Sequence, residues 1–166
     1  MKFCPSATLR LLRTHWIAAL ISACMISGTS MSPVSAATGL EPLKGPRDTR
    51  AYRYFTLPNA LRVLLVSDPS TDKSAAALDI RVGSRHDPDG HLGLSHFLEH
   101  MLFLGTAGFP NAGDYQRFIQ ANGGSNNAST SFEHTNYFFD IENSHFRGAL
   151  ERFSEFFISP LFTESL

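Results

Sequence analysis

The stretch that most constrains this chain runs from Gly93 to Thr106 and reads GLSHFLEHMLFLGT. It is almost wholly apolar apart from His96, Glu99 and His100, and a helix that is apolar on every side is a buried one. With about 100° between successive helical residues, His100 lies one turn from His96 on the same face, and Glu99 flanks the pair. The stretch therefore predicts a buried helix with three polar side chains close together.

Burial of His96, Glu99 and His100 needs a physical reason, because an unpaired buried polar group costs about 1–3 kcal/mol and an unpaired charge more. A zinc ion bound by both imidazoles would satisfy the histidines, and a carboxylate beside it could take a proton from water. The order H-x-x-E-H is the reverse of the zinc-protease pattern H-E-x-x-H. The alternative is that all three are ordinary polar residues of an amphipathic helix, but the stretch offers no polar face for them.

Residues 1–36 predict a signal peptide, because basic residues precede an apolar run too short to span a bilayer. The small residues of Val34-Ser35-Ala36 fit a cleavage site before Ala37. We therefore expect a bacterial protein that is periplasmic or secreted. A retained membrane anchor is one alternative. Another is lipidation at Cys24, since Ile21-Ser22-Ala23-Cys24 resembles a lipobox, and this would tether the protein to the outer membrane.

The two cysteines, Cys4 and Cys24, both lie in this first segment. A processed chain would have no thiol, so any zinc must be held by nitrogen and oxygen ligands. The formal net charge of −1 also gives no basic surface of the kind that binds nucleic acid. Composition thus excludes a disulfide framework, a thiolate metal site and a nucleic-acid partner.

A surface linker is expected at 37–50, and one domain with its own core at 51–166. The predicted elements are strands at 52–57, 61–67 and 75–82, the histidine-bearing helix, a helix at 114–121 capped by Asp114, an extended segment at 126–132, a strand at 135–141 and a helix at 144–158. This order indicates an α+β fold, with a mostly antiparallel sheet and helices packed on one face. The loop histidines His86 and His91 are expected to be solvated rather than to bind metal.

Four segments of the chain resemble the insulinase/pitrilysin family (M16) of zinc metallopeptidases, the inverzincins. In chain order they read LRVLLVSDPSTDKSAAALDIRVGSRHDP, GLSHFLEHMLFLGT, NGGSNNASTSFEHTNYFFDI and ALERFSEFFISPLF. Four segments in the right order are more specific than the five-residue motif alone. The resemblance covers about residues 50 to 165 and implies the N-terminal part of an insulinase-like catalytic domain.

The resemblance also implies roles for individual residues. His96 and His100 correspond to zinc ligands, and Glu99 to the base that activates water. Asn127 and Ala128 fall in the segment that borders the cleft in this family, so 126–130 would be a sheet edge to which a peptide adds as a strand. The alternative for these five residues is a polar edge strand without a ligand.

The family's third zinc ligand is a glutamate beyond the motif, and its expected position lies past Leu166, so the domain is expected to be incomplete at its C-terminus. Further domains of the same parent chain are also expected. The function that follows is a zinc metalloendopeptidase that hydrolyses peptides or small unfolded proteins in the cell envelope. The alternatives are a non-catalytic family member or partner subunit that binds peptides without cleaving them, and a structural domain of the envelope.

Overall fold

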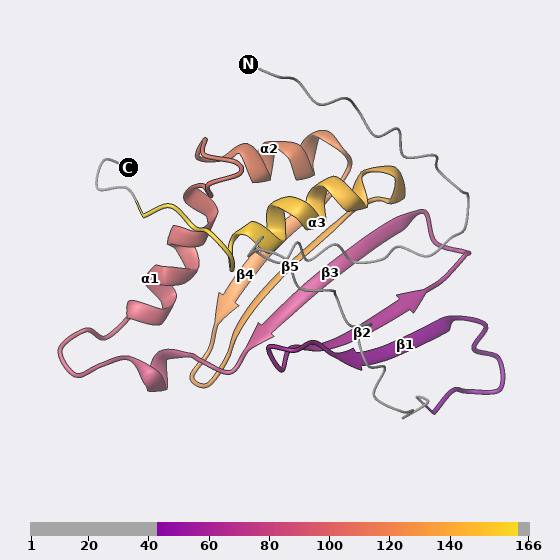
Figure 1. The fold of residues 1–166 in the computed structure, drawn as a ribbon, viewed down its shortest axis with the longest axis horizontal. Coiled ribbons are helices and arrows are strands. Elements are labelled where there is room, and N and C mark those ends of the chain that lie inside the picture. Colours follow the sequence, from indigo (N-terminus) through magenta and orange to yellow (C-terminus); the bar gives the residue numbers. More distant parts are fainter. Residues whose placement is uncertain (1–42, 163–166) are drawn as a thin grey trace, which may run out of the picture.

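A computed structural model of the chain describes residues 43–162 (Figure 1). Its strands are β1 (Ala51–Thr56), β2 (Arg62–Ser67), β3 (Lys73–Ile80), β4 (Ser125–Thr130) and β5 (Thr135–Glu142). Its α-helices are α1 (Leu94–Met101), α2 (Asp114–Ala121) and α3 (Phe146–Glu155), and its 3-10 helices are η1 (Ser84–His86), η2 (Leu102–Leu104) and η3 (Asn143–His145). Residues 43–50, part of the predicted linker, form no helix or strand. The predicted signal peptide at 1–36, with Cys24, lies outside the described residues.

Within the described residues, the strands form two antiparallel sheets. β1 and β2 pair as a hairpin, with Tyr54 opposite Leu64. The other three strands form a second sheet in the order β3-β5-β4, so β5 is central and β4 lies at an edge. The α+β prediction is confirmed, and every strand pair is antiparallel. The N-terminal hairpin forms a separate sheet, which the order of elements alone does not reveal.

Burial alternates along β5, as expected for a strand with one covered face. Tyr137, Phe139 and Ile141 are buried, whereas Phe138 on the other face is 41% exposed. Helices α2 and α3 lie over the covered face (Figure 1). Phe153 of α3 packs edge-on against Phe139 of the strand, with ring centroids 5.3 Å apart. The phenylalanines of α3 therefore belong to the core, as the sequence pattern predicts.

The predicted buried helix over the histidine stretch was wrong in two respects. α1 ends at Met101 and continues as the 3-10 helix η2. It is also largely exposed: Glu99 is its one buried residue, while Leu94, Phe97 and Leu98 are 44%, 60% and 44% exposed. The reason is that α1 contacts the sheet mainly through β4, and its remaining contacts within residues 43–162, with η1 and η2, leave most of its side chains exposed. An apolar sequence shows what a helix could bury but not what lies against it.

Smaller differences concern element ends. Helix α2 covers the predicted residues, but Gly113 with φ 77° is its N-cap and Asp114 its first residue. The predicted helix at 144–158 is a 3-10 turn followed by α3, which ends at Glu155. Among residues 43–162, no helix has the length and apolar character needed to cross a bilayer.

Candidate active site

The start of α1 is fixed by a carboxylate from the preceding loop. Asp87 accepts hydrogen bonds from the Gly93 N–H through Oδ2 at 2.7 Å, and from the Ser95 N–H and hydroxyl through Oδ1 at 2.8 and 2.6 Å. These bonds, those of Ser95 first, hold the pKa of Asp87 below its usual value. They satisfy amide groups that the first turn of a helix leaves unpaired. The helix turn that carries His96 is thereby tied to the loop.

The two motif histidines face each other on α1. Their Nε2 atoms are 3.1 Å apart, and their ring centroids are 4.7 Å apart. One ligand atom from each of His96, Glu99 and His100 can be chosen so that all three lie within 4.8 Å of one another. The imidazoles are exposed, whereas Glu99 is only 5% exposed. The helix thus brings together the three predicted residues, with the carboxylate buried beneath two solvent-accessible rings.

The donor set and its spacing fit a zinc ion. With Zn–N distances of about 2.0–2.1 Å, two nitrogen ligands of a tetrahedral zinc lie about 3.3 Å apart. The 3.1 Å between the two Nε2 atoms is close to this value. A direct N–H···N hydrogen bond between two neutral rings would have a similar length. His96 and His100 could therefore hold zinc without a change of backbone, and a metal titration separates the two interpretations.

Glu99 is held from the sheet. The hydroxyl of Thr130, at the end of β4, donates a hydrogen bond to Oε2 of Glu99. The buried ring of Tyr137 lies on the neighbouring strand, and its burial, with the negative charge of Glu99, raises the pKa of Tyr137 to about 12. Tyr137 therefore stays neutral near pH 7, and Thr130 is the group that binds the carboxylate directly. The sequence analysis missed this contact, which joins residues 31 positions apart.

The two predicted peptide-binding residues lie in the middle of β4, which pairs only with β5 among the described residues. Asn127 is exposed, and its Oδ1 accepts a hydrogen bond from the Ala128 N–H at 2.9 Å. Ala128 is partly buried and packs against the core. The two side chains thus point to opposite faces of the strand. What they share is a place on an edge strand that contacts α1.

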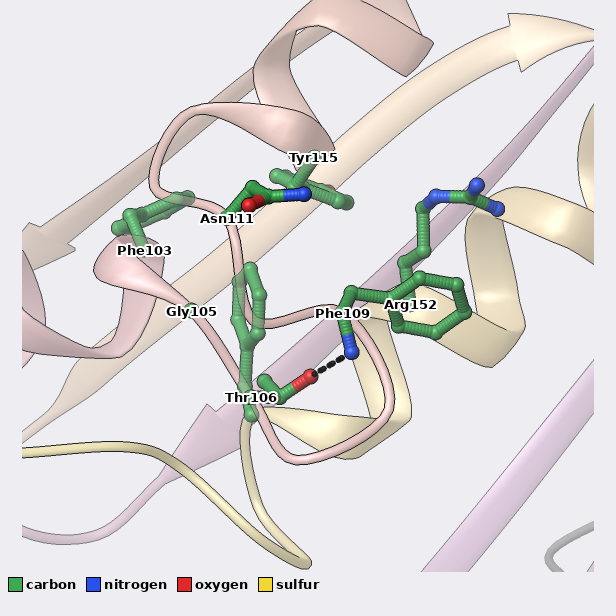
Figure 2. Close-up of a pocket in the computed structure, with 8 residues that line it drawn as sticks. Phe103, Gly105, Thr106, Phe109, Asn111, Tyr115 and Arg152 are labelled. Carbon is green, nitrogen blue, oxygen red and sulfur yellow. Dashed lines mark hydrogen bonds between the residues drawn. The ribbon is translucent and has the colours of Figure 1, made fainter.

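A small pocket lies beyond α1; half of its lining residues are aromatic, and none is a predicted site residue (Figure 2). Within it, the Thr106 hydroxyl accepts a hydrogen bond from the Phe109 N–H at 3.2 Å. The Arg152 guanidinium stacks on the Phe109 ring, 4.3 Å from its centroid. Burial raises the pKa of the Tyr115 hydroxyl, which has no hydrogen-bond partner within residues 43–162. This arrangement orders the chain between η2 and α2.

Comparison with known proteins gives consistent matches. The family described as "Insulinase (Peptidase family M16)" matches residues 62–166. The chain is 52% identical over 134 residues to the human protein named insulin-degrading enzyme, covering 81% of this chain and 13% of the human protein. A "putative zinc protease" of Caenorhabditis elegans is 52% identical over 123 residues, covering 74% of this chain and 14% of that protein.

Among solved structures, pitrilysin superposes with a TM-score of 0.70 at 39% sequence identity. The match covers 72% of this chain and 13% of the pitrilysin chain. The chain thus spans little more than a tenth of the length of these three relatives. The likeness extends over the α+β fold described above, which is the fold of the insulinase family.

Eukaryotic proteins are among the curated relatives, including human and yeast enzymes and an Arabidopsis protein whose name includes "peroxisomal". The prediction of a bacterial periplasmic or secreted location was therefore wrong. It depended on residues 1–36 alone, which lie outside the described residues, and the signal peptide itself stays a prediction. On the family match and these relatives together, the chain belongs to the insulinase family, peptidase family M16.

Proposed function

We propose that the protein is a zinc-dependent endopeptidase that hydrolyses peptides or small unfolded proteins. The observation that carries the proposal is the pair of imidazole Nε2 atoms, His96 and His100, 3.1 Å apart beside a buried carboxylate. The "zinc protease" in the name of the Caenorhabditis relative supports the metal. The name of the human relative, insulin-degrading enzyme, supports a peptide substrate.

In this proposal each residue has one role. His96 and His100 bind the metal through Nε2, which requires that each ring is neutral and carries its proton on Nδ1. When bound, zinc supplies a Lewis acid that makes water more acidic and stabilises negative charge on a carbonyl oxygen. Glu99 takes a proton from the attacking water and passes it to the leaving amine. Glu99 is only 5% exposed, so bulk water competes little with the attacking water for hydrogen bonds to its carboxylate.

The substrate would bind along β4. As an edge strand within the described sheet, β4 has one side on which an extended peptide can add through backbone hydrogen bonds. The Ala128 N–H, now bonded to the Asn127 side chain, is the first donor that such a peptide would use. Because α1 contacts β4, a peptide on this edge would lie beside the histidine pair.

Two protein ligands are fewer than the three of known catalytic zinc sites. We propose that a glutamate outside residues 43–162 completes the set, and that further domains of the same parent chain close over the substrate. A non-catalytic family member that only binds peptides is the alternative, and no observation in the described residues favours it. The intact His96, Glu99 and His100 favour the enzyme.

The test is cleavage of a fluorogenic peptide by the full-length protein with Glu99→Gln. An amide of nearly the same shape cannot accept a proton, so kcat should fall by about 100- to 10,000-fold while zinc is retained. The matched control is Glu142→Gln, which changes an exposed carboxylate at the end of β5. Near-normal cleavage by Glu99→Gln would contradict the role of Glu99, and an inactive wild-type protein that still binds zinc and peptide would favour the non-catalytic alternative.

A further inference from the structure

Glu99 accepts a hydrogen bond that neither metal binding nor peptide binding explains. Thr130 Oγ1 donates to Glu99 Oε2, and this bond connects the end of β4 to the one buried residue of α1. An aliphatic side chain of similar shape at position 130 would fill the same space. The hydroxyl therefore adds something that packing alone does not need.

The neighbouring hydroxyl of Thr135 shows how the protons of the two threonines are used. Thr135 lies opposite Thr130 in the register of β4 and β5, and their hydroxyl oxygens are 3.5 Å apart. The Thr135 hydroxyl donates to the Val82 carbonyl at 2.8 Å, which uses its one proton. An ionised carboxylate can only accept, so the short contact with Glu99 uses the single proton of Thr130, and Thr135 has no proton left to donate to either group.

A carboxylate has two oxygens, and within residues 43–162 only Oε2 of Glu99 has a hydrogen-bond partner. A hydrogen bond to an ionised oxygen is among the stronger kinds in a protein and fixes geometry as well as energy. With Oε2 bonded to Thr130, the side-chain torsions of Glu99 are restricted and Oε1 stays available. A general base needs such an oxygen within hydrogen-bond reach of the water whose proton it takes.

We propose that Thr130 is a positioning residue, whose hydroxyl holds one oxygen of Glu99 so that the other is presented to the attacking water. The inference rests on the proposed function, since it assigns Thr130 an effect on Glu99 as the base. It also separates two roles on one strand. The backbone of β4 takes the peptide, while the hydroxyl at its end sets the catalytic carboxylate.

The test compares Thr130→Val, which removes the hydroxyl at nearly constant shape, with Thr130→Ser, which keeps it. A lost hydrogen bond to a charged group corresponds to about a 10- to 100-fold fall in kcat for Thr130→Val, with KM changed less than about 3-fold. Thr130→Ser should recover most of the rate. Thr56→Val, which makes the same change at an exposed position at the end of β1, is the control and should behave as wild type. Zinc affinity should be equal in all four proteins, because none of these substitutions changes a ligand.

A second readout does not depend on turnover or metal. In the zinc-free protein, the infrared difference between wild type and Thr130→Val should contain a shifted carboxylate stretch, and this difference should vanish in a Glu99→Gln background. In the Glu99→Gln background, Thr130→Val should also have no further effect on kcat, since both substitutions remove the same hydrogen bond. The infrared comparison also covers the case in which Thr130→Val lowers stability, because it can be made at a temperature where both proteins are folded.

The outcomes distinguish this inference from the function beneath it. If Glu99→Gln abolishes cleavage while Thr130→Val cleaves normally, the positioning role is wrong and the proposed function stands. If Thr130→Ser is as slow as Thr130→Val, the hydroxyl is not responsible, which also contradicts the inference. If Glu99→Gln cleaves at the wild-type rate, the proposed function itself fails.

Discussion

Asp87 and Ser95 are joined twice, since one oxygen of Asp87 accepts hydrogen bonds from both the amide and the hydroxyl of Ser95. The other oxygen accepts from Gly93, whose φ of 93° turns the chain into α1. A residue from the loop thus caps the helix that carries the histidine pair. The position of His96 depends on a carboxylate nine residues earlier in the chain.

Removing this cap should loosen the metal centre without touching a ligand. Asp87→Ala leaves the first amides of α1 unpaired, and loss of a helix cap typically lowers the melting temperature of a domain of this size by about 4 °C. Zinc affinity should weaken as well, because His96 lies in the turn that Asp87 holds. The check is thermal unfolding with and without zinc. Asp89→Ala, in the same loop, is the control, and an unchanged midpoint for Asp87→Ala would contradict the capping role.

The exposed face of the second sheet contains an acid-sensitive connection across three strands. Asp140 on β5 bonds Lys73 on β3 at 2.8 Å and also the hydroxyl of Ser125 on β4. These contacts, that with Lys73 first, hold the pKa of Asp140 below its ordinary value of 3.8. The folded state therefore binds a proton less readily than the unfolded state. The stabilisation is present above pH 3.8 and is lost as the pH falls toward the lower folded value.

Urea unfolding between pH 6 and pH 3 measures this connection. Wild type should lose stability below about pH 4, and Asp140→Asn should lose less over the same interval because its amide does not titrate. Asp87 has a lowered pKa of the same sign, so part of the acid sensitivity should remain in the variant. Identical pH profiles for wild type and Asp140→Asn would contradict the effect of Asp140.

Binding of substrate as an added strand can be tested by changing the peptide instead of the protein. Alternate backbone amides of a strand point to opposite sides, so only every second amide can bond to β4. N-methylation of a substrate peptide at one set of positions should raise KM by about tenfold or more, since a hydrogen-bond donor is lost and a methyl group intrudes. Methylation shifted by one residue should have little effect. Equal KM values for the two sets would argue against strand addition to β4.

The sequence predicted the local geometry of the site better than its surroundings. His96 and His100 are four residues apart in one helix, so their contact follows from helical geometry alone. The contact between Thr130 and Glu99 depends on how β4 meets α1, and no periodicity in the chain encodes it. The prediction that α1 is buried was wrong for a related reason. Phe97 is apolar but 60% exposed, because too little of residues 43–162 lies against it.

The strand and helix order was predictable because alternating apolar residues and turn residues mark each element. The pairing of the strands was harder to predict. The sequences of β1 and β2 do not show that their hairpin forms its own sheet, and no pattern places β5 between β3 and β4. The location was predicted wrongly, since a short apolar run does not by itself define a destination. Patterns within one element predicted its type and approximate extent, whereas its burial and its contacts with distant elements depend on the three-dimensional arrangement.

The most direct test of the central claim is a calorimetric zinc titration of the full-length protein. The account predicts one zinc at this centre, bound at least about 100-fold more weakly after His96→Ala or His100→Ala, because each supplies a direct ligand. His91→Ala, which removes an exposed loop histidine, should bind zinc as wild type does. Unchanged zinc affinity in both His96→Ala and His100→Ala would mean that the 3.1 Å pair is only a hydrogen bond between two rings, and would contradict the assignment of the metal centre.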